Sequence, residues 1–484
     1  MIVDGMRSHP ETGYRPLGFI DDRPGRKGSY VANLPVLGTV EDLPRVLDAD
    51  GVKEVVIALP AAEGRTIRAI VQECSRHQVP TKIVPGMVEL ISHSLDLSSL
   101  RQVQVEDLLR RPPVKVDLAA SSTQIRGRRV LITGAGGSIG SELARQVLAR
   151  SPAQLLLLGH GEHSLHELHQ ELSEQDGSTS LTTGGSAERL VTVIADIQDA
   201  LRIGQVLEQH RPQVVFHAAA HKHVPLMESH PAEAVKNNVL GTQILMEAAV
   251  RAGVEKFVLI STDKAVKPAS VLGATKRVAE MLVQSQPEAN GTQFVAVRFG
   301  NVLGSRGSVL SLFKRQIERG GPVRVTHAEM TRYFMTVPEA VLLILQAAAH
   351  GRNGELFVLD MGEPVKVADL ARDLIRLSGY EPEQDILIEF IGPRPGEKLH
   401  EDLAGEGEQL VPTQDQHLLR IRTARVELES LPTAIAELGQ LAANGDDQAV
   451  IAKLCELVAD YTPSERWQTP AHPPLSILGE GEGG

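Results

Sequence analysis

The sequence predicts an α/β fold built on a doubly wound parallel sheet, and two observations support this prediction. Six short apolar segments alternate with helical segments between residues 128 and 298, and the first of them leads into a glycine-rich turn. Parallel strands that are buried on both faces have this continuous, β-branched or leucine-rich composition. The expected strands are residues 130–133, 154–158, 190–194, 213–217, 256–261 and 294–298, and the helices expected between them include 232–252 and 273–285.

The turn after the first strand carries Gly134, Gly137 and Gly140, and residues 139–148 follow with apolar positions at helical spacing. Strand, glycine turn and helix in this order let the backbone approach a pyrophosphate at a helix N-terminus. Three glycines alone are weak evidence, but their flanks favour a Rossmann-type dinucleotide site. We expect Ser138 and Ile139 to contact the cofactor together with the glycines.

At 484 residues the chain is too long for one hydrophobic core. Alternating strands and a helix (17–22, 54–60, 67–76, 82–85) predict a truncated Rossmann-like α/β domain over residues 1–97. The prolines at 112 and 113 favour a linker over 98–127. A catalytic domain with a smaller substrate-binding lid (helices 308–319, 338–350, 367–377) follows over 128–403. Residues 404–484 are expected to form a helical extension (426–442, 447–461) and a disordered tail from 470.

The formal net charge of -12 argues against a nucleic-acid partner, because such a surface is basic. Two cysteines give no disulfide framework and no metal pattern, which favours a reducing compartment. No apolar run approaches the roughly 18 residues that span a bilayer, and no signal peptide is visible. We therefore expect a cytoplasmic protein without a metal, which associates with a membrane only if an upstream segment is missing.

Several polar or small residues follow the second, third and fourth strands. The second strand ends in Gly159, where a ribose-binding carboxylate is usual, so NAD and NADP both stay open. Asp196 and Ile197 follow the third strand and could contact adenine, although a turn-forming Asp is nearly as plausible. After the fourth strand, the small side chains of residues 218–220 (Ala218, Ala219 and Ala220) would leave room for the nicotinamide half.

His217 and His221 suggest a zinc site by their spacing, but they leave a strand and no third ligand follows. Lys222 and His223 fit better as contacts to an anionic substrate.

The segment after the fifth strand contains Thr262, Asp263 and Lys264, and Lys276 follows on the next helix. Adjacent Asp263 and Lys264 supply one potential acid and one potential base beside the expected nicotinamide site. Leu272 stands four residues before Lys276, where short-chain dehydrogenases place a proton-transferring Tyr. A charged pair at a strand end is more often only solvated. The position of this pair beside the expected nicotinamide site makes a catalytic role more plausible.

The lid half carries further cations and amides, which together suggest a positive pocket for a diphosphate, since Arg matches phosphate oxygens with a rigid set of donors. Individually each could be an ordinary surface charge. The candidates are Arg298, Asn301, Arg332, Arg394 and Glu397.

The segments at 133–140, 222–228, 261–265, 273–277 and 394–398 resemble those of the CapD-type polysaccharide-biosynthesis proteins. These are UDP-N-acetylglucosamine 4,6-dehydratases of the extended short-chain dehydrogenase/reductase class. The resemblance implies a tightly bound, recycled NAD or NADP, with Lys264 as base at carbon 5 and Asp263 as acid for the 6-hydroxyl. It also implies that Thr262 binds the oxygen at carbon 4 and that Lys276 holds the nicotinamide ribose.

Two other functions stay open. A UDP-sugar 4-epimerase would need the Tyr that Leu272 replaces, and a catalytically weak nucleotide-sugar-binding scaffold would explain Leu272 and Gly159 together. The resemblance further implies that large relatives are anchored in the inner membrane, with their catalytic domain in the cytoplasm. We also expect a homo-oligomer.

Overall fold

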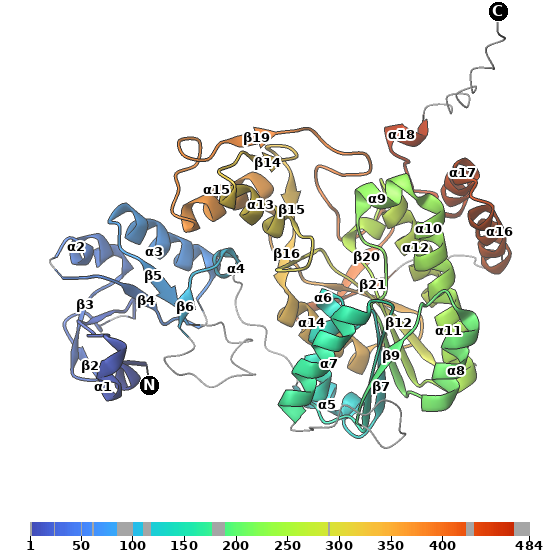
Figure 1. Cartoon of the computed structure of the whole chain (residues 1–484), viewed down its shortest axis with the longest axis horizontal. Helices are drawn as coiled ribbons and strands as arrows, with labels where there is room; N and C mark the ends of the chain where they lie inside the picture. Colours follow the sequence, from blue (N-terminus) through green and yellow to red (C-terminus); the bar gives the residue numbers. More distant parts are fainter. Residues whose placement is uncertain are drawn as a thin grey trace, which may run out of the picture.

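The computed structural model describes residues 2–23, 25–49, 51–60, 62–84, 100–109, 118–176, 189–288, 291–422 and 430–468. The expected tail from residue 470 and the prolines of the expected linker lie outside these ranges. Within them, an N-terminal unit, a lid and a large sheet-containing unit lie side by side (Figure 1).

The large unit contains a nine-stranded sheet in the order β20-β21-β17-β12-β11-β10-β7-β8-β9. Strands β9 to β17 of this order pair in parallel, whereas β20 and β21 pair antiparallel at the edge. All six predicted strands are present within one residue of their expected ends, so the α/β prediction is confirmed. Their bounds are β7 Arg129–Thr133, β8 Gln154–Gly159, β9 Leu190–Ile194, β10 Val214–His217, β11 Lys256–Ile260, β12 Gln293–Arg298, β17 Glu355–Leu359, β20 Gln409–Pro412 and β21 Leu418–Arg422.

Helices cover both faces of this sheet, and a separate apolar cluster lies under each layer. One layer holds α5 Leu118–Ile125, α6 Ser138–Leu148, α7 Glu162–Asp176 and α14 Val337–His350. The other holds α8 Ala200–His210, α11 Gly241–Ala252 and α12 Val271–Gln284. The helix expected over 232–252 is divided into α10 Pro231–Val235, the π-turn η5 Lys236–Leu240 and α11. The preceding α9 spans Val224–Ser229.

The lid is built around a third apolar cluster, to which Phe313, Phe334 and Leu370 belong. Its helices α13 Val309–Glu318 and α15 Val367–Leu377 agree with the sequence expectation. Its strands were not expected and form three two-stranded sheets. They are β13 Asn301–Leu303 with β16 Phe334–Thr336, β14 Val323–Val325 with β19 Ile388–Phe390, and β15 Thr331–Arg332 with β18 Val365–Lys366.

The N-terminal unit has its own apolar cluster around α3 Gly64–Arg76. Two three-stranded sheets, β4-β5-β6 and β1-β3-β2, replace the single sheet expected there. The other elements are α1 Ile2–Ser8, η1 Pro10–Thr12, β1 Phe19–Ile20, β2 Tyr30–Val31, β3 Leu34–Gly38, η2 Val40–Asp42, α2 Leu43–Leu47, β4 Val55–Ile57, β5 Thr81–Ile83, β6 Arg101–Gln102 and α4 Val105–Leu108. Arg68 of α3 and Asp373 of α15 form a 2.9 Å ion pair that joins this unit to the lid.

Two predicted boundaries differ from the structure. Within the predicted linker, β6 pairs with β5 of the N-terminal unit, and α5 packs against α14 of the large unit. At the other end, β20 and β21 extend the main sheet, while α16 Leu431–Ala443 and α17 Asp447–Leu457 add apolar residues to its core. The chain after residue 403 is therefore part of the large unit. The start of the helix expected at 426–442 lies outside the described residues.

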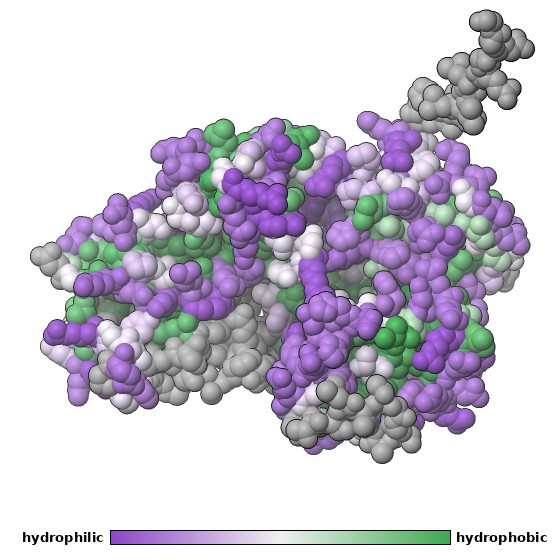
Figure 2. Space-filling model, in the orientation of Figure 1, coloured by the Kyte–Doolittle hydropathy of each residue, from purple (hydrophilic) through white to green (hydrophobic). Residues whose placement is uncertain are grey.

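The described part of the chain contains no helix that combines the length and the apolar composition needed to cross a membrane. Its last described helix is the short α18 Glu465–Gln468. Hydrophilic residues cover most of the face seen in Figure 2, and hydrophobic residues reach it in separate patches.

Candidate functional site

The glycine turn lies between β7 and α6, at the carboxyl edge of the sheet. Gly134 has a φ of +65°, and a Cβ there would lie 2.7 Å from the Ala219 backbone nitrogen. A Cβ on Gly140 would lie 2.2 Å from the Gly134 carbonyl oxygen. Gly137 precedes Ser138, the first residue of α6. The backbone is therefore as close-packed as a pyrophosphate cradle requires, and only glycine fits at the first and third positions.

His217 at the end of β10 ties the turn to the neighbouring helix. Its Nδ1 lies 2.7 Å from the Thr133 hydroxyl and its Nε2 lies 2.9 Å from the Thr242 hydroxyl. Burial lowers the pKa of His217 to about 3, so the ring is neutral. Both ring nitrogens are already in hydrogen bonds, and no group of three metal-ligating side chains exists among the described residues. His217 is a structural bridge that holds residues 218–220 beside Gly134.

Asn238 is a polar site residue that the sequence analysis missed. It lies in the π-turn η5, and its amide oxygen accepts a 2.9 Å hydrogen bond from the His221 backbone N–H. Its amide nitrogen donates to the His221 carbonyl at 3.1 Å and to Thr275 at 3.2 Å. This clamp fixes the loop that carries Lys222 and His223. The available signal was the consecutive pair Asn237-Asn238 within the expected helix.

The loop after β13 closes onto the glycine turn and was also missed. The Arg306 backbone N–H donates to the Ser138 hydroxyl at 3.0 Å, and its guanidinium donates to the Gly136 carbonyl at 3.1 Å. Lys222 Nζ donates to the Arg306 carbonyl at 2.9 Å. A Cβ on Gly307 would lie 2.8 Å from His223. Lys222 and His223 therefore lie where the loop after β13 meets the glycine turn.

Thr262, Asp263 and Lys264 form a compact group directly after β11. Thr262 caps the short turn η6 Asp263–Ala265, and its hydroxyl donates to Asp263 Oδ1 at 2.9 Å. Lys264 Nζ donates to the same oxygen, also at 2.9 Å. The Asp263 side chain is fully buried, whereas that of Lys264 is 21% exposed. Because β11 lies beside β10, this acid–base pair is at the same sheet edge as Ala218.

Lys276 approaches that pair from α12, and its Nζ donates to the Ile260 carbonyl at 2.7 Å. Burial lowers the pKa of Lys276 to about 8. Leu272, one turn earlier on α12, is buried in the apolar cluster between the helices and the sheet. The leucine side chain itself offers no hydroxyl at the position of the usual Tyr.

The two residues expected near adenine lie at the turn after β9. The exposed Asp196 carboxylate accepts a 2.9 Å hydrogen bond from the Gln198 backbone N–H, which is typical of a turn-forming Asp. Ile197 is buried, and a Cβ on Gly241 would lie 2.8 Å from its side chain. At the end of β8, a Cβ on Gly159 would meet nothing closer than 3.7 Å, so the ribose side of the site is open there.

Arg298 requires a correction. Its guanidinium is fully buried and forms 2.7 Å ion pairs with Glu280 of α12 and with Glu408. All of its charge is used within the protein, so the structure does not support the expected contact to a substrate diphosphate. Ser261 Oγ donates to Glu280 at 2.6 Å. Because Arg298 also binds Glu280, it helps to hold the chain at the end of β11.

The remaining lid candidates differ in exposure and in the contacts that they make within the protein. Arg332 donates to the carbonyls of Thr331, Lys398 and Leu399 and is almost buried. Asn301 has a buried side-chain oxygen without a hydrogen-bond partner among the described groups. Arg394 is half exposed and pairs with Glu397 at 3.6 Å.

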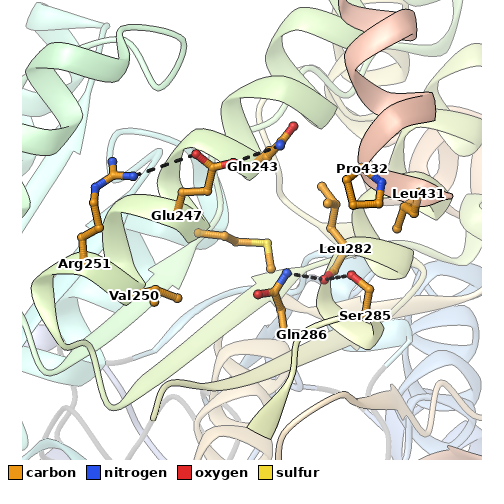
Figure 3. A pocket seen from close by; sticks show the side chains of 10 residues that line it. Gln243, Glu247, Val250, Arg251, Leu282, Ser285, Gln286, Leu431 and Pro432 are labelled. Atoms are coloured by element: carbon orange, nitrogen blue, oxygen red, sulfur yellow. Dashed lines mark hydrogen bonds and ion pairs between the residues drawn. The ribbon is translucent and has the colours of Figure 1, made fainter. Parts of the chain in front are cut away.

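A pocket of about 400 Å³ lies on the outer helical layer rather than at the carboxyl edge. Residues of α11, α12 and the start of α16 line it, and Gln243, Glu247, Ser285 and Gln286 provide its polar rim (Figure 3). None of the predicted site residues lines this pocket.

Known proteins agree with this architecture. Residues 130–423 match the family model described as polysaccharide biosynthesis protein, and residues 1–85 match one described as CoA-binding domain. The chain is 50% identical over 409 residues to the capsular polysaccharide biosynthesis protein CapD of Staphylococcus aureus. The aligned region covers 84% of this chain and 67% of CapD. It is 48% identical over 408 residues to the probable polysaccharide biosynthesis protein EpsC of Bacillus subtilis (strain 168), with the same coverage.

Among solved structures, Pen from Bacillus thuringiensis is 32% identical, with a TM-score of 0.55 over 62% of this chain and 89% of Pen. The family model covers more than half of the chain, and the glycine turn and the Asp263–Lys264 pair both lie within it. The chain therefore belongs to the polysaccharide biosynthesis protein family that includes CapD and EpsC.

Proposed function

We propose that the protein is an NAD(P)-dependent nucleotide-sugar 4,6-dehydratase, a hydro-lyase that converts UDP-N-acetylglucosamine to a UDP-4-keto-6-deoxy sugar. The observation that carries this proposal is the hydrogen-bonded Asp263–Lys264 pair at the carboxyl edge of the sheet. A 4,6-elimination needs one acid and one base beside the same sugar carbons, and this pair supplies both. The family resemblance supports the same assignment. So does Leu272, which stands where a 4-epimerase would need a Tyr.

The glycine turn fits a dinucleotide. Gly134 and Gly140 have no side chains that would separate the turn from the neighbouring backbone or block the approach of a pyrophosphate. We infer that Ser138 and Ile139 bind there with Gly137, that Ala218, Ala219 and Ala220 line the nicotinamide half, and that Asp196 and Ile197 lie near adenine. When bound, NAD or NADP would accept a hydride from carbon 4 of the sugar and return it to carbon 6. Lys276 would orient the nicotinamide ribose.

The acid–base step follows from the pair itself. With the sugar in its 4-keto form, the neutral Lys264 amine takes the proton from carbon 5 and becomes an ammonium. The electrons left on carbon 5 form the bond to carbon 6, and the carbon 6–oxygen bond breaks. The Asp263 carboxylic acid gives its proton to the departing hydroxyl, which leaves as water. When carbon 6 has received the hydride, the Lys264 ammonium would return a proton, exchangeable with solvent, to carbon 5. Thr262, which donates to Asp263 at 2.9 Å, would switch to the oxygen at carbon 4.

Substrate binding would use the loop and the lid that meet over the site. We infer that Lys222, His223, Asn301, Arg394 and Glu397 contact the substrate. The Arg332 guanidinium is almost buried and is bound by three carbonyls, so we assign it to holding the lid segment instead. Arg298 is left out because its guanidinium is paired in the core.

Incubation of the purified protein with UDP-N-acetylglucosamine in heavy water tests the reaction. We expect a product that has lost one water and carries deuterium at carbon 5, which mass spectrometry and NMR detect. A product of unchanged mass would point to a 4-epimerase instead. Tight binding of UDP-N-acetylglucosamine without turnover, with the cofactor supplied in excess, would point to a catalytically weak nucleotide-sugar-binding scaffold.

A further inference from the structure

Glu401 is a buried carboxylate that the proposed mechanism does not use. It is 7% exposed and lies just after the segment at 394–398. Its Oε1 lies 3.5 Å from Lys264 Nζ and 3.9 Å from Arg332 Nη2. Its Oε2 lies 3.7 Å from Lys398 Nζ and accepts no hydrogen bond from a described group. Three cations from three separate segments thus converge on one carboxylate.

The partners of Glu401 are themselves fixed, so its position is well determined. Arg332 donates to the carbonyls of Lys398 and Leu399, which precede Glu401 in the chain. Lys398 Nζ donates to the Val266 carbonyl at 2.7 Å, and this ties the segment to the turn that carries Lys264. Both Arg332 and Lys398 therefore hold Glu401 against the turn.

The charges that face Lys264 come from three elements. Asp263 belongs to its own turn, Glu401 and Lys398 belong to the segment after β19, and Arg332 is on β15 with Tyr333 beside it. Burial alone would lower the pKa of the Lys264 ammonium. Asp263 and Glu401 outweigh burial and the repulsion by Arg332, and the pKa of Lys264 is raised.

This charge state bears on the reaction, because a protonated Lys264 cannot act as a base. The proton can cross the 2.9 Å hydrogen bond from Lys264 Nζ to Asp263 Oδ1. One N–H bond then breaks, one O–H bond forms, and the ion pair becomes the neutral amine and carboxylic acid that elimination needs. A negative charge on Glu401 favours the ammonium, so it sets how readily this transfer occurs.

We propose that Glu401 is a positioning residue of the site: its carboxylate holds the Lys264 ammonium beside Asp263 and sets the proton affinity of that amine. This inference rests on the proposed function for its role in catalysis. Its effect on Lys264 can be measured without any turnover.

The experiment compares the unmodified protein with Glu401→Gln and, as the matched control, Asp402→Asn. Asp402 is the exposed next residue, so its variant removes the same charge without touching Lys264. Acetylation of Lys264 by acetic anhydride, followed by peptide mass spectrometry from pH 7 to 12, reports the midpoint of its titration. We expect Glu401→Gln to lower this midpoint by roughly one pH unit and Asp402→Asn to leave it in place.

The rate profile provides the second measurement. The acid limb of kcat/KM for dehydration should move to lower pH by the same amount in Glu401→Gln, with KM within about twofold of the unmodified value. Glu401→Asp keeps the charge and should show less than half of the midpoint shift, which also covers the case that the Gln variant does not fold.

An unchanged Lys264 midpoint in Glu401→Gln, or an equal shift in Asp402→Asn, would overturn the inference. A shifted midpoint in a protein that never releases water from the sugar would instead reject the proposed function and keep the coupling between Glu401 and Lys264.

Discussion

Two buried charge clusters lie on neighbouring strands of the sheet and differ in how completely they are paired. At the end of β12, Arg298 is bound by Glu280 and Glu408, and each carboxylate oxygen in that cluster has a hydrogen-bond partner. At the end of β11, Lys264 lies between Asp263 and Glu401, and one oxygen of each carboxylate has no hydrogen bond from a described group.

The difference separates structure from chemistry. A fully satisfied buried network holds its geometry, because any movement would leave a charge without a partner. A partly satisfied one keeps acceptor capacity for a substrate hydroxyl and can move a proton internally. We infer that the Arg298 cluster supports the sheet edge, whereas the Lys264 cluster performs the proposed reaction.

The largest expected effect is on the Lys264 cluster. Asp263→Asn keeps the shape of the side chain but removes the acid, so kcat for dehydration should fall by roughly 10²–10⁴-fold. Because Glu401 still lies 3.5 Å from Lys264 Nζ, the ammonium keeps one carboxylate, and the melting temperature should fall only modestly. Steady-state kinetics and thermal unfolding measure both, with Asp402→Asn as control. A variant that keeps more than a tenth of the rate would show that the acid lies elsewhere.

The Arg298 cluster should respond in the opposite way. Arg298→Met leaves the buried Glu280 and Glu408 with Arg277 alone as a cation, at 3.1 and 3.4 Å, so the free energy of unfolding should fall by up to about 3–5 kcal/mol. Urea unfolding measures this. Arg324→Met is the control, because Arg324 and its partner Glu389 are both exposed, and it should change stability by less than about 1 kcal/mol. Unchanged stability with a raised KM for the UDP-sugar would restore Arg298 as a substrate contact.

A third test concerns Lys276, which is buried and whose Nζ donates a hydrogen bond to the Ile260 carbonyl. Burial lowers its pKa from 10.5 to about 8, so between these values the unfolded chain binds more protons than the folded one. The free energy of unfolding contributed by this group therefore rises from pH 8 to 10.5 and is at its lowest below pH 8.

Lys276→Met removes the destabilisation that comes from burying this ammonium group. The apoprotein variant should be more stable than the unmodified protein at pH 7, and the difference should shrink by up to about 3 kcal/mol toward pH 10.5. Urea unfolding at several pH values measures it. A difference that is constant with pH would mean that the pKa of Lys276 is the same in the folded and the unfolded chain.

The sequence was sufficient for the parallel part of the fold, because strands buried on both faces carry a continuous apolar signal. It did not reveal β20 and β21, since their antiparallel pairing to β17 depends on contacts between distant segments. The π-turn in the helix expected over 232–252 was equally invisible, because the apolar spacing continues through it.

The same distinction applies to the site. The placement of Thr262, Asp263, Lys264 and Lys276 at one edge of the sheet could be predicted, since they follow a strand end and the next helix start. Arg298 was misassigned because the sequence does not tell which buried carboxylate meets it, and Glu408 lies 110 residues away. Glu401 has no local signal at all, because its three cations come from different elements.

The smallest expected effect is that of Leu272→Tyr, which asks whether the proton chemistry needs a phenol as well as the Lys264 cluster. Leu272 is buried in the apolar cluster, so the larger Tyr should overpack it and lower the free energy of unfolding by about 1–3 kcal/mol. Because Thr262, Asp263 and Lys264 already form one hydrogen-bonded group, the rate of dehydration should not rise. Urea unfolding and steady-state kinetics on the same preparation measure both. A rate gain of about tenfold or more would show that the Lys264 cluster lacks a proton carrier that the phenol replaces.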